Sequence, residues 1–186
     1  ILVDSGFGSD AAETIRLLES AAVAPSDLQW LVNTHYHCDH AGGNHHLQTH
    51  HGVRIAAFHT EAKLVNRRDR QACSIEWLNQ SIEAYTVNQL LYEGDILNTG
   101  SREWQVLHTP GHTLGHIAFH SDGELIAGDT VHADDVAWVN FFREGVGAID
   151  RMIATIERLK LLNVRTAYSG HGPITTDPQA RFDAAL

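Results

Sequence analysis

Residues 33–44 read NTHYHCDHAGGN, and three histidines and an aspartate fall within six consecutive positions of this stretch: His35, His37, Asp39 and His40. An apolar run of strand length, LQWLVNT, leads directly into it. Histidine is the commonest metal ligand in proteins. The stretch therefore predicts either a metal-binding loop at the end of a strand or a surface loop that is rich in histidine, and later parts of the sequence decide between them.

The spacing of the cluster suggests a geometry. In an extended segment, residues two apart point the same way, so the side chains of His35, His37 and Asp39 converge. His40 is out of phase and joins them only if the chain bends. Gly42 and Gly43 permit such a bend, because glycine accepts backbone conformations that other residues avoid.

Three later segments repeat one pattern, in which an apolar run is followed by a glycine and then by one metal-binding residue type. LHTPGHTLGH contains His112, LIAGDT contains Asp129, and AYSGHGP contains His171. With the first cluster these make five histidines and two aspartates, more than the four ligands of one tetrahedral zinc. Two metals roughly 3.5–4 Å apart with a shared carboxylate account for such a set.

The motifs HYHCDH, TPGHTLGH, AGDT and SGHG, in this order, resemble the metallo-β-lactamase superfamily in its binuclear, glyoxalase II-like hydrolase branch. The resemblance implies an α/β fold, the αββα sandwich, with N-terminal strands missing from this sequence. It implies that one metal is bound by His35, His37 and His112, the second by Asp39, His40 and His171, and that Asp129 bridges them.

The resemblance also implies an activity. A binuclear hydrolase of this kind uses a metal-bridging hydroxide to cleave an ester, thioester or lactone, with Asp39 and Asp129 as catalytic residues. We expect two divalent ions, Zn²⁺ first, with iron or manganese as alternatives. The alternative function is a mononuclear iron oxidoreductase of the persulfide dioxygenase type, which resembles the same motif set. A non-catalytic binding module is disfavoured, because such relatives typically lose ligands and every expected ligand is here.

A substrate surface is suggested by residues 138–145, WVNFFREG. Trp138, Phe141 and Phe142 are candidates to line a pocket, and Arg143 is a candidate to anchor an anionic substrate. In the alternative interpretation these aromatic residues belong to the core and Arg143 pairs with an acidic neighbour.

Other residues are assigned lesser roles. We expect His45, His46, His50 and His51 on a solvated helix face, His116 as a structural hydrogen-bonding residue, and Cys38 packed behind the site. Asp4 is either the partner of a ligand histidine, whose second nitrogen usually meets a carboxylate or carbonyl, or an ordinary turn aspartate.

Composition limits the class of protein. The 186 residues predict a single domain over 1–186, and the formal charge of −10 disfavours nucleic acid as a partner. No apolar run approaches the roughly 18 residues of a membrane span. We expect a small-molecule substrate and a cytoplasmic protein, and leave a homodimer open.

The periodicity of the chain predicts mixed helices and strands. Helical spacing is expected from Asp10, over residues 60–83, and over Ala148–Leu162, where Ile149, Ile153, Ile156 and Leu159 recur. Short strands separated by glycine-containing turns are expected between residues 85 and 128. Asp177-Pro178 predicts the start of a last helix.

Overall fold

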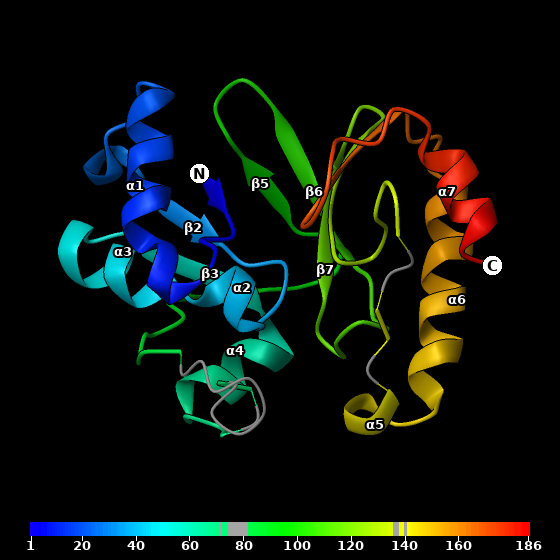
Figure 1. Ribbon diagram of the computed structural model, residues 1–186, viewed down its shortest axis with the longest axis horizontal. Helices are drawn as coiled ribbons and strands as arrows, with labels where there is room; N and C mark the ends of the chain where they lie inside the picture. Colours follow the sequence, from blue (N-terminus) through cyan, green and yellow to red (C-terminus); the bar gives the residue numbers. More distant parts are fainter. Residues whose placement is uncertain (71, 74–81, 136–137, 140) are drawn as a thin grey trace. The chain divides into compact units, whose positions relative to one another are not determined.

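The computed structural model describes residues 1–70, 72–73, 82–135, 138–139 and 141–186. The chain divides into two compact units, Ile1–Leu91 and Tyr92–Leu186, and each contains its own sheet with helices (Figure 1). Mixed helices and strands confirm the predicted α/β class. The predicted single domain over 1–186 stays a prediction.

The first unit has a parallel sheet in the order β1-β2-β3-β4. Its strands are β1 (Leu2–Val3), β2 (Trp30–Val32), β3 (Arg54–Phe58) and β4 (Gln89–Leu91). Parallel neighbours need crossover connections. These contain the helices α1 (Ala11–Ser20), α2 (Cys38–Ala41), α3 (Asn44–His51) and α4 (His59–Asn66), with 3₁₀ turns at Gly8–Asp10 and Pro25–Asp27. The histidine-rich stretch follows β2 at the carboxyl edge of this sheet, where such folds place their sites.

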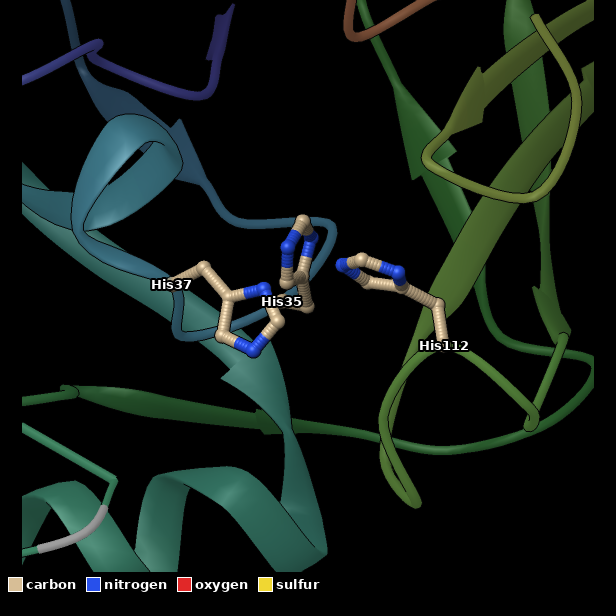
Figure 2. A group of neighbouring side chains, drawn as sticks. All are labelled: His35, His37 and His112. Carbon is tan, nitrogen blue, oxygen red and sulfur yellow. The ribbon is translucent and has the colours of Figure 1, made fainter. Parts of the chain in front are cut away.

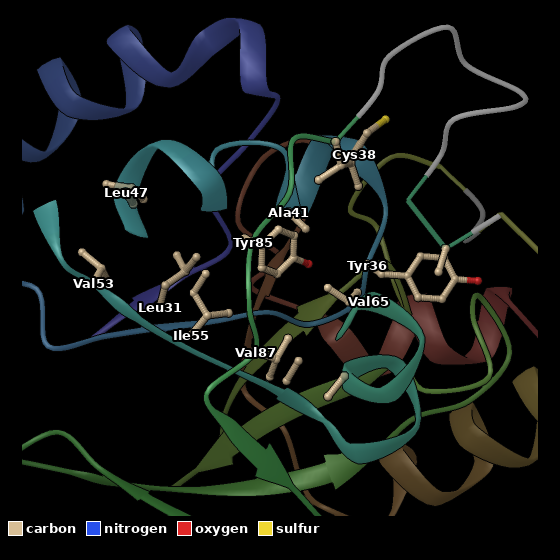
Figure 3. Close-up of a cluster of buried hydrophobic side chains, with 14 of the residues drawn as sticks. Leu31, Tyr36, Cys38, Ala41, Leu47, Val53, Ile55, Val65, Tyr85 and Val87 are labelled. Carbon is tan, nitrogen blue, oxygen red and sulfur yellow. The ribbon is translucent and has the colours of Figure 1, made fainter. Parts of the chain in front are cut away.

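Buried side chains from the strands and helices form the core of the first unit (Figure 3). Leu31 of β2 and Ile55 of β3 are fully buried, and Leu47 of α3 packs with them. Of the helix predicted over residues 60–83, the structure contains α4, which ends at Asn66. Residues 71 and 74–81 of that prediction lie outside the described residues.

The second unit has a mixed sheet in the order β5-β6-β7-β8-β9. Its strands are β5 (Ile96–Asn98), β6 (Glu103–His108), β7 (Ile117–Ser121), β8 (Glu124–Gly128) and β9 (Thr166–Ser169). Neighbours are antiparallel from β5 to β8, and β8 pairs with β9 in parallel. The helices of this unit are α5 (Phe141–Glu144), α6 (Gly147–Lys160) and α7 (Pro178–Ala184).

Helix α6 lies where it was predicted, but the face that it buries is not the one that carries Ile149 and Ile153. Ile156 and Leu159 are buried in the core of the second unit, whereas Ile149 and Ile153 are 48% and 39% exposed. The buried stripe runs instead through Ala148 and Met152. The predicted start of the last helix is confirmed, because the Asp177 side chain accepts a hydrogen bond from the Ala180 amide at 3.2 Å.

Among the described residues, no helix combines the length and the apolar character that crossing a bilayer requires.

Candidate metal centre

The loop after β2 differs from the predicted extended geometry. His37 is extended, with φ −61° and ψ 152°, but it is the N-cap of the one-turn helix α2. Asp39 and His40 lie on that helix, whereas the prediction had placed Asp39 in an extended segment with His35 and His37. The helical turn therefore places both side chains, and the His40 Nε2 to Asp39 Oδ2 distance is 3.6 Å.

The two glycines are also explained differently from the prediction. Gly42 and Gly43 have ordinary negative φ values of −63° and −78°, so no glycine-only bend is present. A Cβ on Gly42 would overlap the Gly8 amide, and one on Gly43 would lie 2.7 Å from the Ser5 carbonyl oxygen. Glycine is needed here because the Ser5–Gly8 backbone packs directly against this stretch.

Asp4 is the partner of a candidate ligand. Its carboxylate accepts hydrogen bonds from the Thr34 amide at 2.8 Å, the Thr34 hydroxyl at 2.7 Å and His40 Nδ1 at 2.9 Å. Asp4 also has φ +57°, a left-handed conformation in which aspartate is tolerated better than most residues. The interpretation as an ordinary turn aspartate is therefore wrong.

These hydrogen bonds fix the tautomers of two histidines. A carboxylate only accepts, so Nδ1 of His40 carries the proton and Nε2 carries the lone pair. The Thr34 hydroxyl donates its one proton to Asp4, so in its 3.0 Å contact with His35 Nδ1 it accepts. His35 Nε2 is then also a lone-pair nitrogen, the form that binds metal.

His35 and His37 belong to the same loop of the first unit (Figure 2). Their side chains are buried, with exposures of 1% and 4%, and their ring centroids lie 4.5 Å apart. One nitrogen from each ring lies within 4.8 Å of one from the other, close enough to share an ion.

In the second unit, His112 lies in the loop after β6 (Figure 2) and is 2% exposed. Its Nδ1 lies 2.6 Å from the Trp138 carbonyl oxygen, which only accepts, so Nε2 is again the lone-pair nitrogen. Gly111 allows this loop to pack closely against α6. Its φ is +150°, and a Cβ at this position would lie 2.7 Å from Met152 Cα, too close for a larger residue.

Asp129, at the end of β8, lies beside two histidines of its unit. Its Oδ2 is 3.4 Å from His112 Nε2 and 3.5 Å from His171 Nε2. These distances exceed the 2.7–3.2 Å of ordinary N–H···O hydrogen bonds. Two ligands bonded to one tetrahedral ion at about 2.0–2.2 Å lie roughly 3.3–3.5 Å apart, so the spacing fits a shared metal. Asp129 is 4% exposed, whereas the His171 side chain is 48% exposed.

His116 has the structural role that was predicted for it. It is fully buried, and its Nε2 accepts a hydrogen bond from the Asp129 amide at 3.0 Å. Its Nδ1 contacts the hydroxyls of Thr109 and Thr130 at 2.7 and 3.3 Å. The lone pair that a metal would need already binds the Asp129 backbone, so His116 positions Asp129.

The sequence interpretation missed His132 and the Trp138 carbonyl. His132 Nε2 lies 3.8 Å from Asp129 Oδ1, and its ring centroid is 5.7 Å from that of His171. Its position three residues after Asp129 was a signal that could have found it. A backbone carbonyl leaves no such signal, because every residue has one.

The candidate substrate residues lie at the surface. Trp138, Phe141 and Phe142 are 49%, 41% and 90% exposed, so their alternative assignment to the core is wrong. Arg143 is half-buried on α5. Cys38 is 2% exposed and belongs to the core of the first unit, as predicted.

The donor set fits a transition metal. Lone-pair imidazole nitrogens and carboxylate oxygens are the ligands that zinc and related divalent ions take at such sites. The Asp4 carboxylate at His40 and the Trp138 carbonyl at His112 are the usual supports of a metal-binding histidine.

Three comparisons identify what the chain is similar to. A sequence model described as the Metallo-beta-lactamase superfamily matches residues 1–171. Acyl-coenzyme A thioesterase MBLAC2 of Homo sapiens is 30% identical over 148 residues, which are 68% of this chain and 51% of that protein. Hydroxyacylglutathione hydrolase GloC of Haemophilus influenzae is 31% identical over 176 residues, 91% of this chain and 80% of that protein.

A solved structure agrees with this result. The crystal structure of a metallo-beta-lactamase family protein from Thermus thermophilus has a TM-score of 0.84 at 24% identity, covering 98% of this chain and 68% of that one. This likeness confirms the predicted metallo-β-lactamase fold. The chain spans about half the length of the first curated relatives it matches. By sequence and by fold, the chain belongs to the metallo-β-lactamase superfamily.

Proposed function

We propose that this chain carries the site of a metal-dependent hydrolase that cleaves acyl thioesters with two divalent metal ions, Zn²⁺ first and iron or manganese as alternatives. The proposal rests on one observation. In each of three buried histidines, His35, His40 and His112, Nδ1 donates a hydrogen bond to an acceptor. The Nε2 atom of each ring therefore has a free lone pair with which it can bind a metal ion.

The proposed ligand sets draw on both units. One set is His35, His37 and His112, the other is Asp39, His40 and His171, and Asp129 is shared. Support for the shared role comes from the second unit alone, where Asp129 Oδ2 neighbours one histidine of each set at 3.4 and 3.5 Å. Family membership supports the proposed ligand sets.

The residues behind the ligands have defined tasks. Bound ions of this kind lower the pKa of coordinated water to about 7 and so supply hydroxide at neutral pH. Asp4 and Thr34 hold the imidazoles of His40 and His35 in one tautomer, the Trp138 carbonyl holds that of His112, and Asp39 and Asp129 supply negative charge.

The substrate class rests on the named relatives. One is an acyl-coenzyme A thioesterase and another a hydroxyacylglutathione hydrolase, names that describe acyl groups carried on thiols. The exposed rings of Phe141 and Phe142 lie with their centroids 4.2 Å apart and their planes inclined by 33°, and they offer an apolar surface to an acyl chain. Arg143 would then meet an anionic part of the carrier.

Esters and lactones are the other substrates of the same chemistry. The persulfide dioxygenase alternative is not favoured, because the relatives reported above are named as hydrolases. The homodimer and the cytoplasmic location stay predictions.

The test combines metal analysis with a hydrolysis panel. Chelator-free protein should hold two metal ions and hydrolyse an acyl-coenzyme A or an acylglutathione faster than simple esters. Asp129→Ala should lose metal and at least about 100-fold in turnover, the scale of removing one essential electrostatic group. Asp134→Ala, an exposed aspartate in the following loop, is the matched control and should leave both unchanged.

Two results would overturn the proposal. One is less than one metal per chain in chelator-free protein. The other is wild-type turnover in Asp129→Ala. Oxygen consumption with a persulfide substrate and one iron per chain would establish the dioxygenase instead.

A further inference from the structure

Helix α3 of the first unit carries four histidines that the proposed metal centre does not use: His45, His46, His50 and His51. Three of them gather on its outer face. The ring centroid of His46 lies 4.6 Å from that of His50 and 5.7 Å from that of His51. His50 is exposed, and His46 and His51 are half-buried, so solvent reaches the group.

The spacing is that of a helical metal-binding pair. Residues four apart on an α-helix lie one turn above each other on the same face. Two histidines at this spacing are a recurrent way to hold zinc on a helix. The ring contact between His46 and His50 indicates that both side chains already occupy the same patch of surface.

The backbone of α3 is held in place by contacts with the rest of the first unit. Leu47, which lies between His46 and His50 in the sequence, is 2% exposed and packs in the core. Gln48 exchanges two hydrogen bonds with the backbone of Thr86, at 2.8 and 2.9 Å, and His45 Nδ1 lies 2.7 Å from the Ala84 carbonyl. A ligand pair on a fixed backbone loses little conformational freedom on binding.

The electrostatics favour a cation at this position. His50 and His51 form the last turn of α3, where unsatisfied carbonyls give a partial negative charge, and Gly52 ends the helix in a left-handed conformation. Burial and the neighbouring histidines lower the pKa of His46, while Glu83 opposes them. A lowered pKa leaves more neutral imidazole, the metal-binding form, near pH 7.

We propose that His46 and His50, with His51 as a third donor, bind a divalent transition metal on the surface of α3, independently of the hydrolase centre. Imidazole donors suit Cu²⁺, Ni²⁺ and Zn²⁺, and Cu²⁺ should bind most tightly of the three. Because the position is open to solvent, this metal should exchange faster than one held by buried ligands.

The experiment loads the full chain with Zn²⁺, removes the rapidly exchanging zinc by desalting, and then titrates the protein with Ni²⁺ and measures binding by calorimetry. The wild type should bind about one further Ni²⁺ per chain, because α3 presents one pair at this spacing. His46→Ala and His50→Ala should each weaken that binding about 100-fold, because each variant leaves one donor of the pair and loses the effective concentration of the second. Thr49→Ala, on the same helix, should bind like the wild type.

A variant of the other centre separates the two proposals. Asp129→Ala should keep the Ni²⁺ site on α3 whether or not the hydrolase proposal holds. The inference is overturned if His46→Ala titrates like the wild type, or if Asp129→Ala abolishes the binding. If the alanine variants do not fold, His46→Gln and His50→Gln replace them. Binding in the wild type should also disappear below about pH 6, where histidines take up protons. Persistence of binding under acid would contradict the assignment to histidine.

Discussion

At the scale of single residues, Asp4 offers the sharpest test of how the imidazoles are held. Asp4→Asn removes the charge that holds His40 Nδ1 and still tolerates φ +57°. We expect metal affinity to fall about 10–100-fold with little change in folding. Competition with a chromophoric chelator measures the affinity, and Asp27→Asn, an exposed aspartate of the same unit, is the control. Equal affinities in the two variants would refute the role of Asp4.

His116 should matter for the stability of the second unit. His116→Ala leaves the Asp129 amide and the Thr109 hydroxyl without their buried partner, at a cost of about 1–3 kcal/mol in the free energy of unfolding. His116→Gln can still accept from the amide and should recover part of that loss. Urea denaturation of both variants measures the difference. The assignment fails if glutamine is no better than alanine.

The sequence predicted which residues form the candidate site but not the protonation of their rings. The types and order of His35, His37 and the later candidates were readable, because metal sites use few residue types and glycines mark the strand ends. The tautomers were not readable. They depend on Asp4 and Trp138, which lie 36 and 26 positions from the histidines they hold.

At the scale of elements, Gly42 controls how α2 packs. Gly42→Ala forces a Cβ against the Gly8 amide and should cost at least about 1–3 kcal/mol in unfolding free energy. Gly147→Ala is the matched control, since its Cβ would meet only the flexible end of Arg151 at 3.3 Å. There alanine should be neutral or stabilise α6 by up to about 1 kcal/mol. Equal melting temperatures for the two variants would contradict the packing explanation.

Helix α6 provides a second matched pair. Ile156 is 1% exposed and Ile153 is 39% exposed on the same helix. Ile156→Ala should cost about 2–5 kcal/mol, because it leaves a cavity among buried side chains. Ile153→Ala should change stability by no more than about 0.5 kcal/mol. Chemical denaturation of both variants tests which face of α6 is buried, and the reverse order would show that the helix is turned the other way.

At the scale of the whole molecule, metal removal should change how the chain unfolds. A metal that binds only the folded state stabilises it, so the loaded protein should melt at a higher temperature than the metal-free protein. Chelation should remove about 4 kcal/mol for a metal present at a thousand times its Kd, or roughly 10 °C in melting temperature. Calorimetry with and without chelator measures this, and Asp129→Ala should respond less. An unchanged melting temperature would contradict metal binding by the folded chain.

Sequence alone determined the α/β class, the family resemblance and the seven candidate ligands, because these depend on residue type, periodicity and order along the chain. Tertiary structure decided the rest. It placed Asp39 and His40 on a helical turn, and it determined which face of α6 is buried. It also required glycine at positions 42 and 43, because the Ser5–Gly8 backbone packs closely against them. Each of these outcomes depends on atoms that are distant in sequence, and local spacing carries no information about which backbone will pack nearby.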